Sequence, residues 1–139
     1  MRTIQQEYNK KTDCTISLIL YHKNEFQIFW GKYLMKFQLA VNLERMDNSV
    51  DMENVKNHTL EMVKMADQGG FNIVWAAEHH AIEMTIAPNP FQILTWWANH
   101  TEKIRLGTAV VNAAYWHPIN LAGEAAFTDL ISGGRLEFG

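Results

Sequence analysis

From residue 35 onward, strand-like segments alternate with helix-like segments, and the links between them are short. Apolar residues that alternate or run together predict strands over residues 36–42, 72–76, 104–111 and 135–139. Apolar residues at helical spacing predict helices over 51–68, over 90–99, and from 118 to a stop at 132–134. Strands separated by helices are typical of parallel βαβ units with right-handed crossovers. The chain is therefore predicted to be an α/β protein with about three βα units and a fourth strand.

Two architectures fit this order of elements. One is an open doubly wound sheet, and the other is the N-terminal part of a TIM-like (β/α)8 barrel. A complete barrel needs about 250 residues, so a chain of 139 residues would form less than half of one. The pattern of strands and helices leaves both architectures open.

Local signals mark the ends of the predicted helices. Asn89 is expected to cap the second helix, with Pro90 at its first position and Gln92 three residues after the cap. The first helix is expected to stop at Gly69-Gly70. One face of that first helix is expected to carry Val55, Thr59, Met62, Val63 and Ala66.

Residues 1–34 lack a sustained period of either kind, so we treat them as an N-terminal extension to a domain over residues 35–139. Trp30, Gly31 and Lys32 imply a purine-rich stretch of DNA a few codons ahead of Met35. A ribosome-binding site has that composition and position. We therefore hypothesise that residues 1–34 are a leader that is not part of the native protein.

Charge and composition narrow the classes of partner. The net charge is −3, and the Lys and Arg residues are scattered, so the sequence predicts neither nucleic-acid nor membrane binding. No apolar run approaches the roughly 20 residues that span a bilayer. Cys14 is the only cysteine, which excludes an intrachain disulfide and fits a cytoplasmic location.

Three polar residues, Glu78, His79 and His80, directly follow the buried strand predicted at 72–76. Consecutive residues at a strand end point to opposite faces, so the two histidines do not predict a shared metal ion. They could form a buried polar cluster that holds the strand end. Alternatively, one imidazole faces a pocket as a general base or hydrogen-bond donor. We favour the second interpretation because βα folds bind ligands at strand carboxyl ends.

Two further segments are expected near the same edge. Small residues from Gly107 to Asn112 either let a flat ligand approach the backbone or simply pack tightly against a neighbouring strand. His117 precedes Pro118 at a helix N-terminus, where capping explains it about as well as ligand binding does. The residues alone do not separate these alternatives.

Other features are expected to be structural. Arg135 is predicted to form a buried ion pair with Glu124 or Asp129, and Trp96-Trp97 to lie in the core or at a subunit interface. Gap-filling or pocket-lining positions are predicted for Met62, Met65 and Met84.

An ordered series of residues runs through the predicted elements: Gly70-Phe71, Trp75, Ala77-Glu78-His79-His80, Pro90, Ile104-Arg105-Leu106-Gly107-Thr108-Ala109, His117-Pro118, Glu124, Asp129 and Ser132-Gly133-Gly134-Arg135. In order and spacing, the series resembles the bacterial luciferase-like flavin monooxygenases over about residues 35–139. The aromatic segment Tyr115-Trp116-His117 is most similar to the alkanal monooxygenase-like branch.

The resemblance implies the N-terminal part of a TIM-like (β/α)8 barrel that binds reduced FMN at the carboxyl ends of its strands. It implies that His79 is the catalytic base. It places Thr108, Ala109, Val110 and His117 at the flavin, with a non-proline cis peptide between Ala109 and Val110. The family's flavin-phosphate site lies beyond the fourth strand, so no residue here is assigned to it.

The implied reaction is oxygen insertion into an aldehyde or similar small organic substrate, with O2 as co-substrate and a separate flavin reductase as donor of reduced FMN. Family members are often dimers that pack helices like the second and third, which would give Trp96-Trp97 a role. A fragment of this length is expected to be inactive by itself. Two alternatives remain: a deazaflavin (F420)-dependent oxidoreductase on the same fold, and a non-catalytic luciferase-like subunit.

Overall fold

The computed structural model describes residues 16–19, 27–30 and 33–139, and the chain divides into two units, residues 1–36 and 37–139. In the first unit, the described residues form an antiparallel sheet in the order β1-β2-β3. Its strands are β1 (Ile16–Ile19), β2 (Gln27–Trp30) and β3 (Tyr33–Leu34). These strands were not predicted, because residues 1–34 show no sustained period of either kind. That residues 1–34 are a leader outside the native protein stays a hypothesis.

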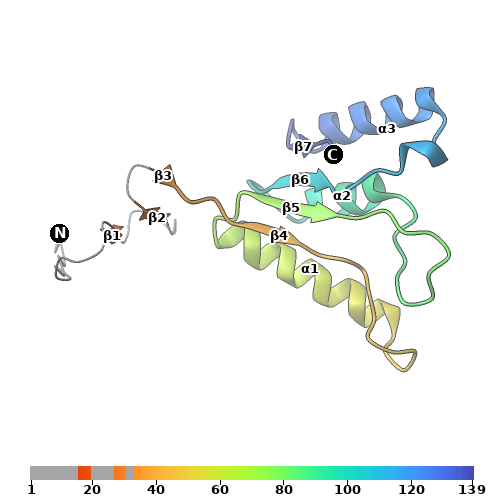
Figure 1. The fold of residues 1–139 in the computed structure, drawn as a ribbon, viewed down its shortest axis with the longest axis horizontal. Coiled ribbons are helices and arrows are strands. Elements are labelled where there is room, and N and C mark those ends of the chain that lie inside the picture. The colour runs from red at the N-terminus through yellow and green to blue at the C-terminus, as the bar shows by residue number, and fades with distance from the viewer. Residues whose placement is uncertain (1–15, 20–26, 31–32) are drawn as a thin grey trace. The chain divides into compact units, whose positions relative to one another are not determined.

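The second unit contains a parallel sheet with helices, as the sequence predicted (Figure 1). The sheet order is β4-β5-β6-β7. Its strands are β4 (Gln38–Ala40), β5 (Ile73–Ala76), β6 (Arg105–Thr108) and β7 (Leu136–Glu137). The strands follow one another in chain order without a reversal. This order fits a barrel segment rather than the doubly wound alternative, which has a switch point in its strand order.

Three α-helices connect these strands, at the positions that the sequence predicted. They are α1 (Met52–Gln68), α2 (Pro90–Ala98) and α3 (Pro118–Ile131), and a short 3-10 helix, η1 (Ala113–Tyr115), precedes α3. The predicted cap of α2 is confirmed, because the side chain of Asn89 accepts the N–H groups of Phe91 and Gln92. In the part of the chain that the structure describes, no helix has the length and apolar character needed to cross a bilayer.

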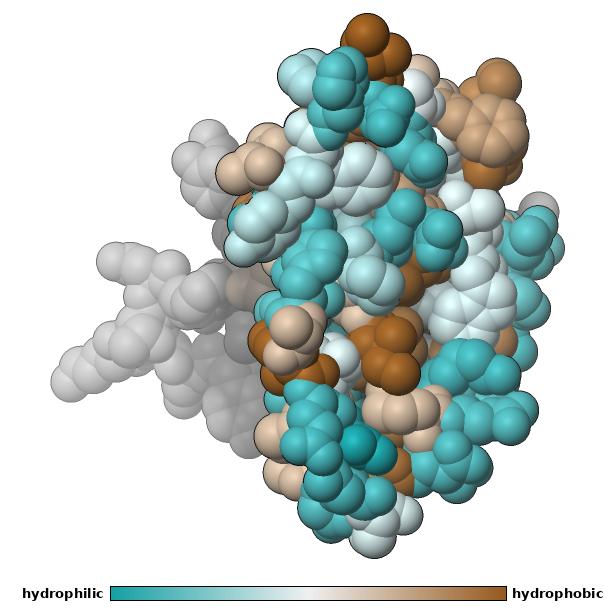
Figure 2. Space-filling model, turned by 90° about the vertical axis from the view of Figure 1, so that its right-hand side faces the viewer, coloured by the Kyte–Doolittle hydropathy of each residue, from teal (hydrophilic) through white to brown (hydrophobic). Residues whose placement is uncertain are grey.

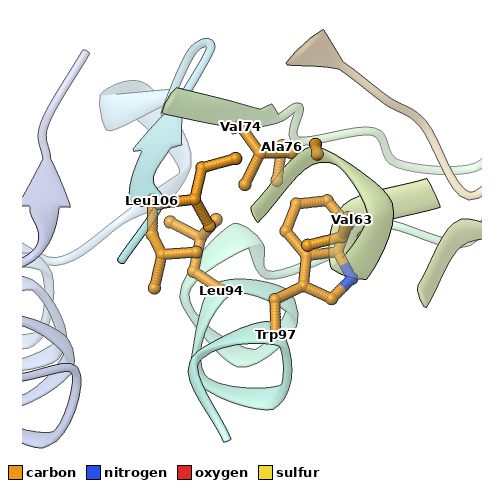
Figure 3. Close-up of a cluster of buried hydrophobic side chains, with 8 residues drawn as sticks. Val63, Val74, Ala76, Leu94, Trp97 and Leu106 are labelled. Carbon is orange, nitrogen blue, oxygen red and sulfur yellow. The ribbon is translucent and has the colours of Figure 1, made fainter. Parts of the chain in front are cut away.

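The core lies between the sheet and the helices α1 and α2 (Figure 3). Figure 3 shows Leu94 and Trp97 of α2 and Val63 of α1 turned toward Val74 and Leu106 on the strands. The full set of buried core residues is Val63, Ala66, Val74, Ala76, Leu94, Trp97, Ile104 and Leu106. Trp97 is therefore a core residue, one of the two alternatives predicted for it.

The core alternative predicted for the methionines was wrong. Met62, Met65 and Met84 are 44%, 69% and 39% exposed, so none fills a gap in the core, and pocket lining stays a prediction. On α1 the buried line runs through Val55, Thr59, Val63 and Ala66. Met62 lies one position from Val63, at the margin of that line, and turns outward.

The other face of the sheet has polar cross-strand contacts. The indole N–H of Trp75 donates to Oε1 of Gln38 at 2.9 Å, and Arg105 pairs with Glu137. Trp75 also lies directly opposite Gly107 in the register of β5 and β6. A Cβ on Gly107 would overlap the Trp75 ring and lie 3.0 Å from Cδ1 of Ile73. Gly107 therefore makes room for Trp75, so at this residue the tight-packing alternative is correct.

The predicted ion pair of Arg135 with Glu124 or Asp129 was also wrong. The Arg135 guanidinium donates to the carbonyl oxygens of Ala98, Ile104 and Ser132 and to the hydroxyl of Thr101, at 2.7–3.2 Å. Carbonyl groups at a helix end lack partners within the helix, and a guanidinium has five donors for such groups. Asp129 instead accepts the N–H of Leu136.

Candidate active site

The carboxyl ends of β5, β6 and β7 meet at one edge of the sheet. Ala76 and Thr108 are register partners, and the N–H of Ala109 donates to the oxygen of Ala76 at 2.8 Å. The N–H of Val111 donates to the oxygen of Gly139 at 3.0 Å. The predicted meeting of the segments after these strands is therefore confirmed. Figure 2 views the side to which the arrows of β5 and β6 point in Figure 1, and it shows hydrophobic side chains interspersed among hydrophilic ones.

Glu78 is the centre of a hydrogen-bonded network at this edge. The residue is 5% exposed, and its carboxylate faces three nitrogen atoms. The N–H of Asn112 donates to Oε2 at 2.8 Å, and the indole N–H of Trp116 lies 3.1 Å from each oxygen. Nε2 of His80 lies 2.6 Å from Oε1. The network joins the end of β5 to the segment between β6 and α3.

These contacts hold Glu78 in its charged form. Burial alone would raise the pKa of this carboxyl group, because a charge is poorly solvated inside the protein. The hydrogen bonds from His80, Asn112 and Trp116 outweigh burial and lower the pKa below the usual value for Glu. The site therefore contains a buried carboxylate with its charge balanced by donors.

His79 has different surroundings from its neighbour His80. Its N–H donates to the oxygen of Ala87 at 2.8 Å, and the two residues form an isolated antiparallel bridge. Its side chain is half-buried, and within residues 33–139 the imidazole makes no hydrogen bond. Of the two interpretations for the Glu78-His79-His80 segment, the polar cluster thus describes Glu78 and His80. A role for His79 toward a ligand stays a prediction.

Thr108, Ala109 and Val110 follow one another at the end of β6. Thr108 is fully buried, and its hydroxyl both accepts the N–H of Gly139 and donates to the oxygen of Gly139. Ala109 and Val110 are exposed, Val110 at 60%. The peptide bond between Ala109 and Val110 is cis, as the resemblance implied. The edge thus presents a short exposed segment of backbone, which Thr108 ties to the end of the next strand.

His117 is exposed and caps α3. Its Nδ1 accepts the N–H of Ile119 at 3.3 Å, so the capping interpretation describes its observed contact. The preceding residue, Trp116, is joined to Glu78. Trp116 and Asn112 were not predicted as partners of Glu78. The one signal available was chemical, since a buried carboxylate needs donors and a buried indole needs an acceptor.

A separate apolar hollow of about 340 Å3 lies beside α3, lined by Pro118, Leu121, Ala122, Ala125 and Phe138. It contains none of the candidate site residues. Within the described residues, no group of three or more His, Cys, Asp or Glu side chains could hold a metal ion.

Comparison with known proteins places these observations in a family. Residues 35–139 match the family described as luciferase-like monooxygenase. Over 105 residues, the chain is 48% identical to the oxygenase component of flavin-dependent trigonelline monooxygenase from Acinetobacter baylyi, covering 76% of this chain and 29% of that protein. It is 30% identical to the alkanal monooxygenase alpha chain of Photorhabdus luminescens over 80 residues, covering 58% of this chain and 22% of that protein.

A solved structure supports the fold. The oxygenating constituent of 3,6-diketocamphane monooxygenase from Pseudomonas putida, in complex with FMN, superimposes with a TM-score of 0.69 at 20% identity. The superposition covers 76% of this chain and 29% of that one. The chain therefore spans less than a third of the length of these relatives, and it forms an N-terminal part of their barrel.

Proposed function

The chain belongs to the luciferase-like monooxygenase family, and from this premise we propose that the complete protein is a flavin-dependent monooxygenase. The observation that carries the proposal is the 48% identity to the oxygenase component of a flavin-dependent monooxygenase over 105 residues. The geometry supports it, because the polar residues gather at the carboxyl ends of parallel strands. In barrel enzymes that edge is where active sites lie.

The residues at this edge are compatible with reduced FMN. The exposed backbone of Ala109 and Val110 offers a surface that a flat ring system can approach. His79 lies on the adjacent strand end with an imidazole that makes no hydrogen bond within residues 33–139. Bound reduced FMN would supply the two electrons with which O2 gives one oxygen atom to the substrate and one to water.

The candidate residues at this edge would then have separate roles. Thr108 holds the end of β6 to the end of β7, so that Ala109 and Val110 would keep a fixed place against a bound ring. His79 accepts or returns a proton, which an imidazole can do at neutral pH. His117 lies at the outer part of this edge, at the start of α3. Its Nδ1 accepts the N–H of Ile119, and this contact holds the imidazole in place.

The partner and the substrate follow from the same relatives. A similar protein named as an oxygenase component implies a separate flavin reductase that supplies reduced FMN. Trigonelline and an aldehyde are the two small organic substrates to test first, because the relatives are named for trigonelline and alkanal oxidation. Dimerisation through α2 and α3 and a cytoplasmic location stay predictions.

Flavin is favoured over the deazaflavin alternative because the most similar of these relatives is named as flavin-dependent. A non-catalytic subunit is the remaining alternative, and the geometry of Glu78 and His79 does not separate it from an enzyme. Turnover by the complete protein, measured with no second family member present, would separate these two alternatives.

The test uses the complete protein, a reductase that keeps FMN reduced, and 18O2. We expect 18O in the product from trigonelline or an aldehyde, with oxygen uptake that depends on the substrate. Removing a general acid–base group typically costs about 10²–10⁴-fold in rate, so His79→Ala should lose product by that factor. Lys56→Ala, an exposed change on α1, is the matched control and should keep wild-type activity.

Three results would contradict the proposal. One is turnover with reduced F420 but not with reduced FMN. Another is tight flavin binding with no product from any substrate offered. The third is a His79→Ala variant that oxygenates its substrate as fast as the Lys56→Ala control.

A further inference from the structure

The partners of Glu78 differ in what they can donate and accept. The backbone N–H of Asn112 and the indole N–H of Trp116 are donors only. They contact both oxygens, and two such donors favour the carboxylate over the neutral acid. The lowered pKa of Glu78 agrees with an ionised side chain.

An ionised Glu78 decides which nitrogen of His80 carries a proton. Oε1 lies 2.6 Å from Nε2 of His80, and a carboxylate can only accept at that distance. His80 therefore has its proton on Nε2, and Nδ1 is the nitrogen left for another partner. The His80 ring also meets the Tyr115 ring edge-on, with centroids 5.1 Å apart at 84°. Carboxylate and aromatic ring together hold this imidazole in one orientation.

No other histidine at this edge has such a partner. Nδ1 of His117 accepts a backbone N–H, and the imidazole of His79 has no carboxylate among the residues the structure describes. The side chain of His80 is 39% exposed, so solvent reaches part of the ring. A proton on Nδ1 makes an imidazolium, and the carboxylate of Glu78 directly stabilises that charge.

We propose that Glu78 is a positioning residue that acts through His80. It fixes His80 as the Nε2–H form and holds Nδ1 at the site edge, where this nitrogen relays protons between water and the reacting groups at the site. The catalytic consequence of the pair rests on the proposed monooxygenase function. The assignment of the protons does not, since it follows from the hydrogen-bonded network.

The network has a second, purely structural consequence that must be separated from the first. Glu78 also ties down the segment 112–116 through Asn112 and Trp116. Trp116→Phe removes the indole donor but keeps an aromatic ring beside Phe91, whose centroid lies 5.7 Å away. This variant weakens the structural tie and leaves the contact between Glu78 and His80 in place.

The first experiment reads the protons directly, in the complete protein labelled with 15N-histidine and without flavin. We expect the His80 signals, assigned by their loss in His80→Gln, to show a protonated Nε2 and an unprotonated Nδ1. In Glu78→Gln we expect the share of the Nε2–H form to fall toward that of a free imidazole, while Trp116→Phe keeps the wild-type share. A proton on Nδ1 of His80, or identical signals in Glu78→Gln and wild type, would overturn the proposal whether or not the enzyme turns over.

The second experiment is a double-mutant cycle on kcat of the complete enzyme. If Glu78 acts through His80, Glu78→Gln and His80→Gln should each lose about 10²-fold, and the double variant should lose no more than either one. Trp116→Phe should lose at least tenfold less than Glu78→Gln, and added imidazole should restore part of the activity of His80→Ala. Two results would contradict the proposal. One is a double variant whose loss of kcat is the product of the two single losses, and the other is a loss in Trp116→Phe equal to that in Glu78→Gln. Either result would mean that Glu78 serves only to hold the segment 112–116. A wild-type enzyme without turnover would instead refute the proposed function, and the 15N signals would still decide the proton assignment.

Discussion

Gly107→Ala is the substitution that most directly tests how the sheet is packed. The added Cβ would overlap Cε3 and Cζ3 of Trp75 and lie 3.0 Å from Cδ1 of Ile73. Carbon atoms pack at roughly 3.5–4.0 Å, so the ring must move by about 1 Å or the strands must separate. The indole cannot turn away freely, because its N–H is bonded to Gln38 at 2.9 Å.

The cost follows from these contacts. Overfilling a packed site costs about 1–3 kcal/mol, and a lost indole hydrogen bond adds about 1 kcal/mol. Replacing glycine by alanine in a strand returns about 0.5–1 kcal/mol through backbone entropy. We therefore expect Gly107→Ala to lower the free energy of unfolding by about 2–3 kcal/mol.

Urea unfolding of the complete protein, followed by circular dichroism, measures this change, and α3 offers a matched control. Gly123 has nothing within 4 Å of an added Cβ, so Gly123→Ala should raise the free energy of unfolding by about 0.5–1 kcal/mol. Trp75→Leu should make Gly107→Ala less costly, because the clash disappears with the indole. A Gly107→Ala protein that keeps wild-type stability but loses flavin binding would show that the glycine serves the ligand, and our packing argument would be wrong.

Three further substitutions test contacts within the second unit. The Asp67 carboxylate accepts the N–H groups of residues 102–104 at 2.7–2.9 Å, so Asp67→Asn should cost about 2 kcal/mol at neutral pH, measured by urea unfolding. Burial would raise the pKa of Asp67, but these bonds and the charge of Arg135 lower it below the ordinary 3.8. Its stabilisation is therefore complete above pH 3.8 and is lost as the pH falls through the lower folded-state pKa; a gap between variant and wild type that does not shrink on acidification would contradict this. Arg135→Met leaves three backbone carbonyl groups without their donor and should cost about 3 kcal/mol in thermal unfolding, and no loss of stability would refute the assigned contacts. Leu94→Ala, at a fully buried position, should cost about 3 kcal/mol in denaturant unfolding, whereas a loss under about 1 kcal/mol would mean that the core can collapse around it.

Most of the fold could be predicted because its signals are local. The cap of α2 joins Asn89 to residues two and three positions away, and the buried face of α1 repeats every three or four residues. The edge that carries the candidate site could be predicted too, because parallel strands end on the same side of their sheet. The errors came where the periodic signal is weak: Met62 lies beside the buried line of α1, and β1 to β3 lie in a segment without a sustained period.

Partners distant in the chain could not be predicted. Glu78 meets Asn112 and Trp116 across 34 and 38 residues, and the sequence signals only that a buried carboxylate needs donors. Arg135 illustrates the same limit, since nearby acids suggested an ion pair, while its actual partners are carbonyl groups near the end of α2 and the start of β6.

From residue 35 onward, the sequence by itself determined the order of strands and helices, the cap of α2, and the placing of Glu78, His79 and His80 after β5, because each depends on neighbours within a few residues. Only the tertiary structure decided which of these side chains meet. The register that sets Trp75 against Gly107 is a property of two strands together. The fold in the same way brings the carboxylate of Glu78 to His80. Such contacts depend on where whole elements pack, and that is settled by the shared core rather than by any one segment.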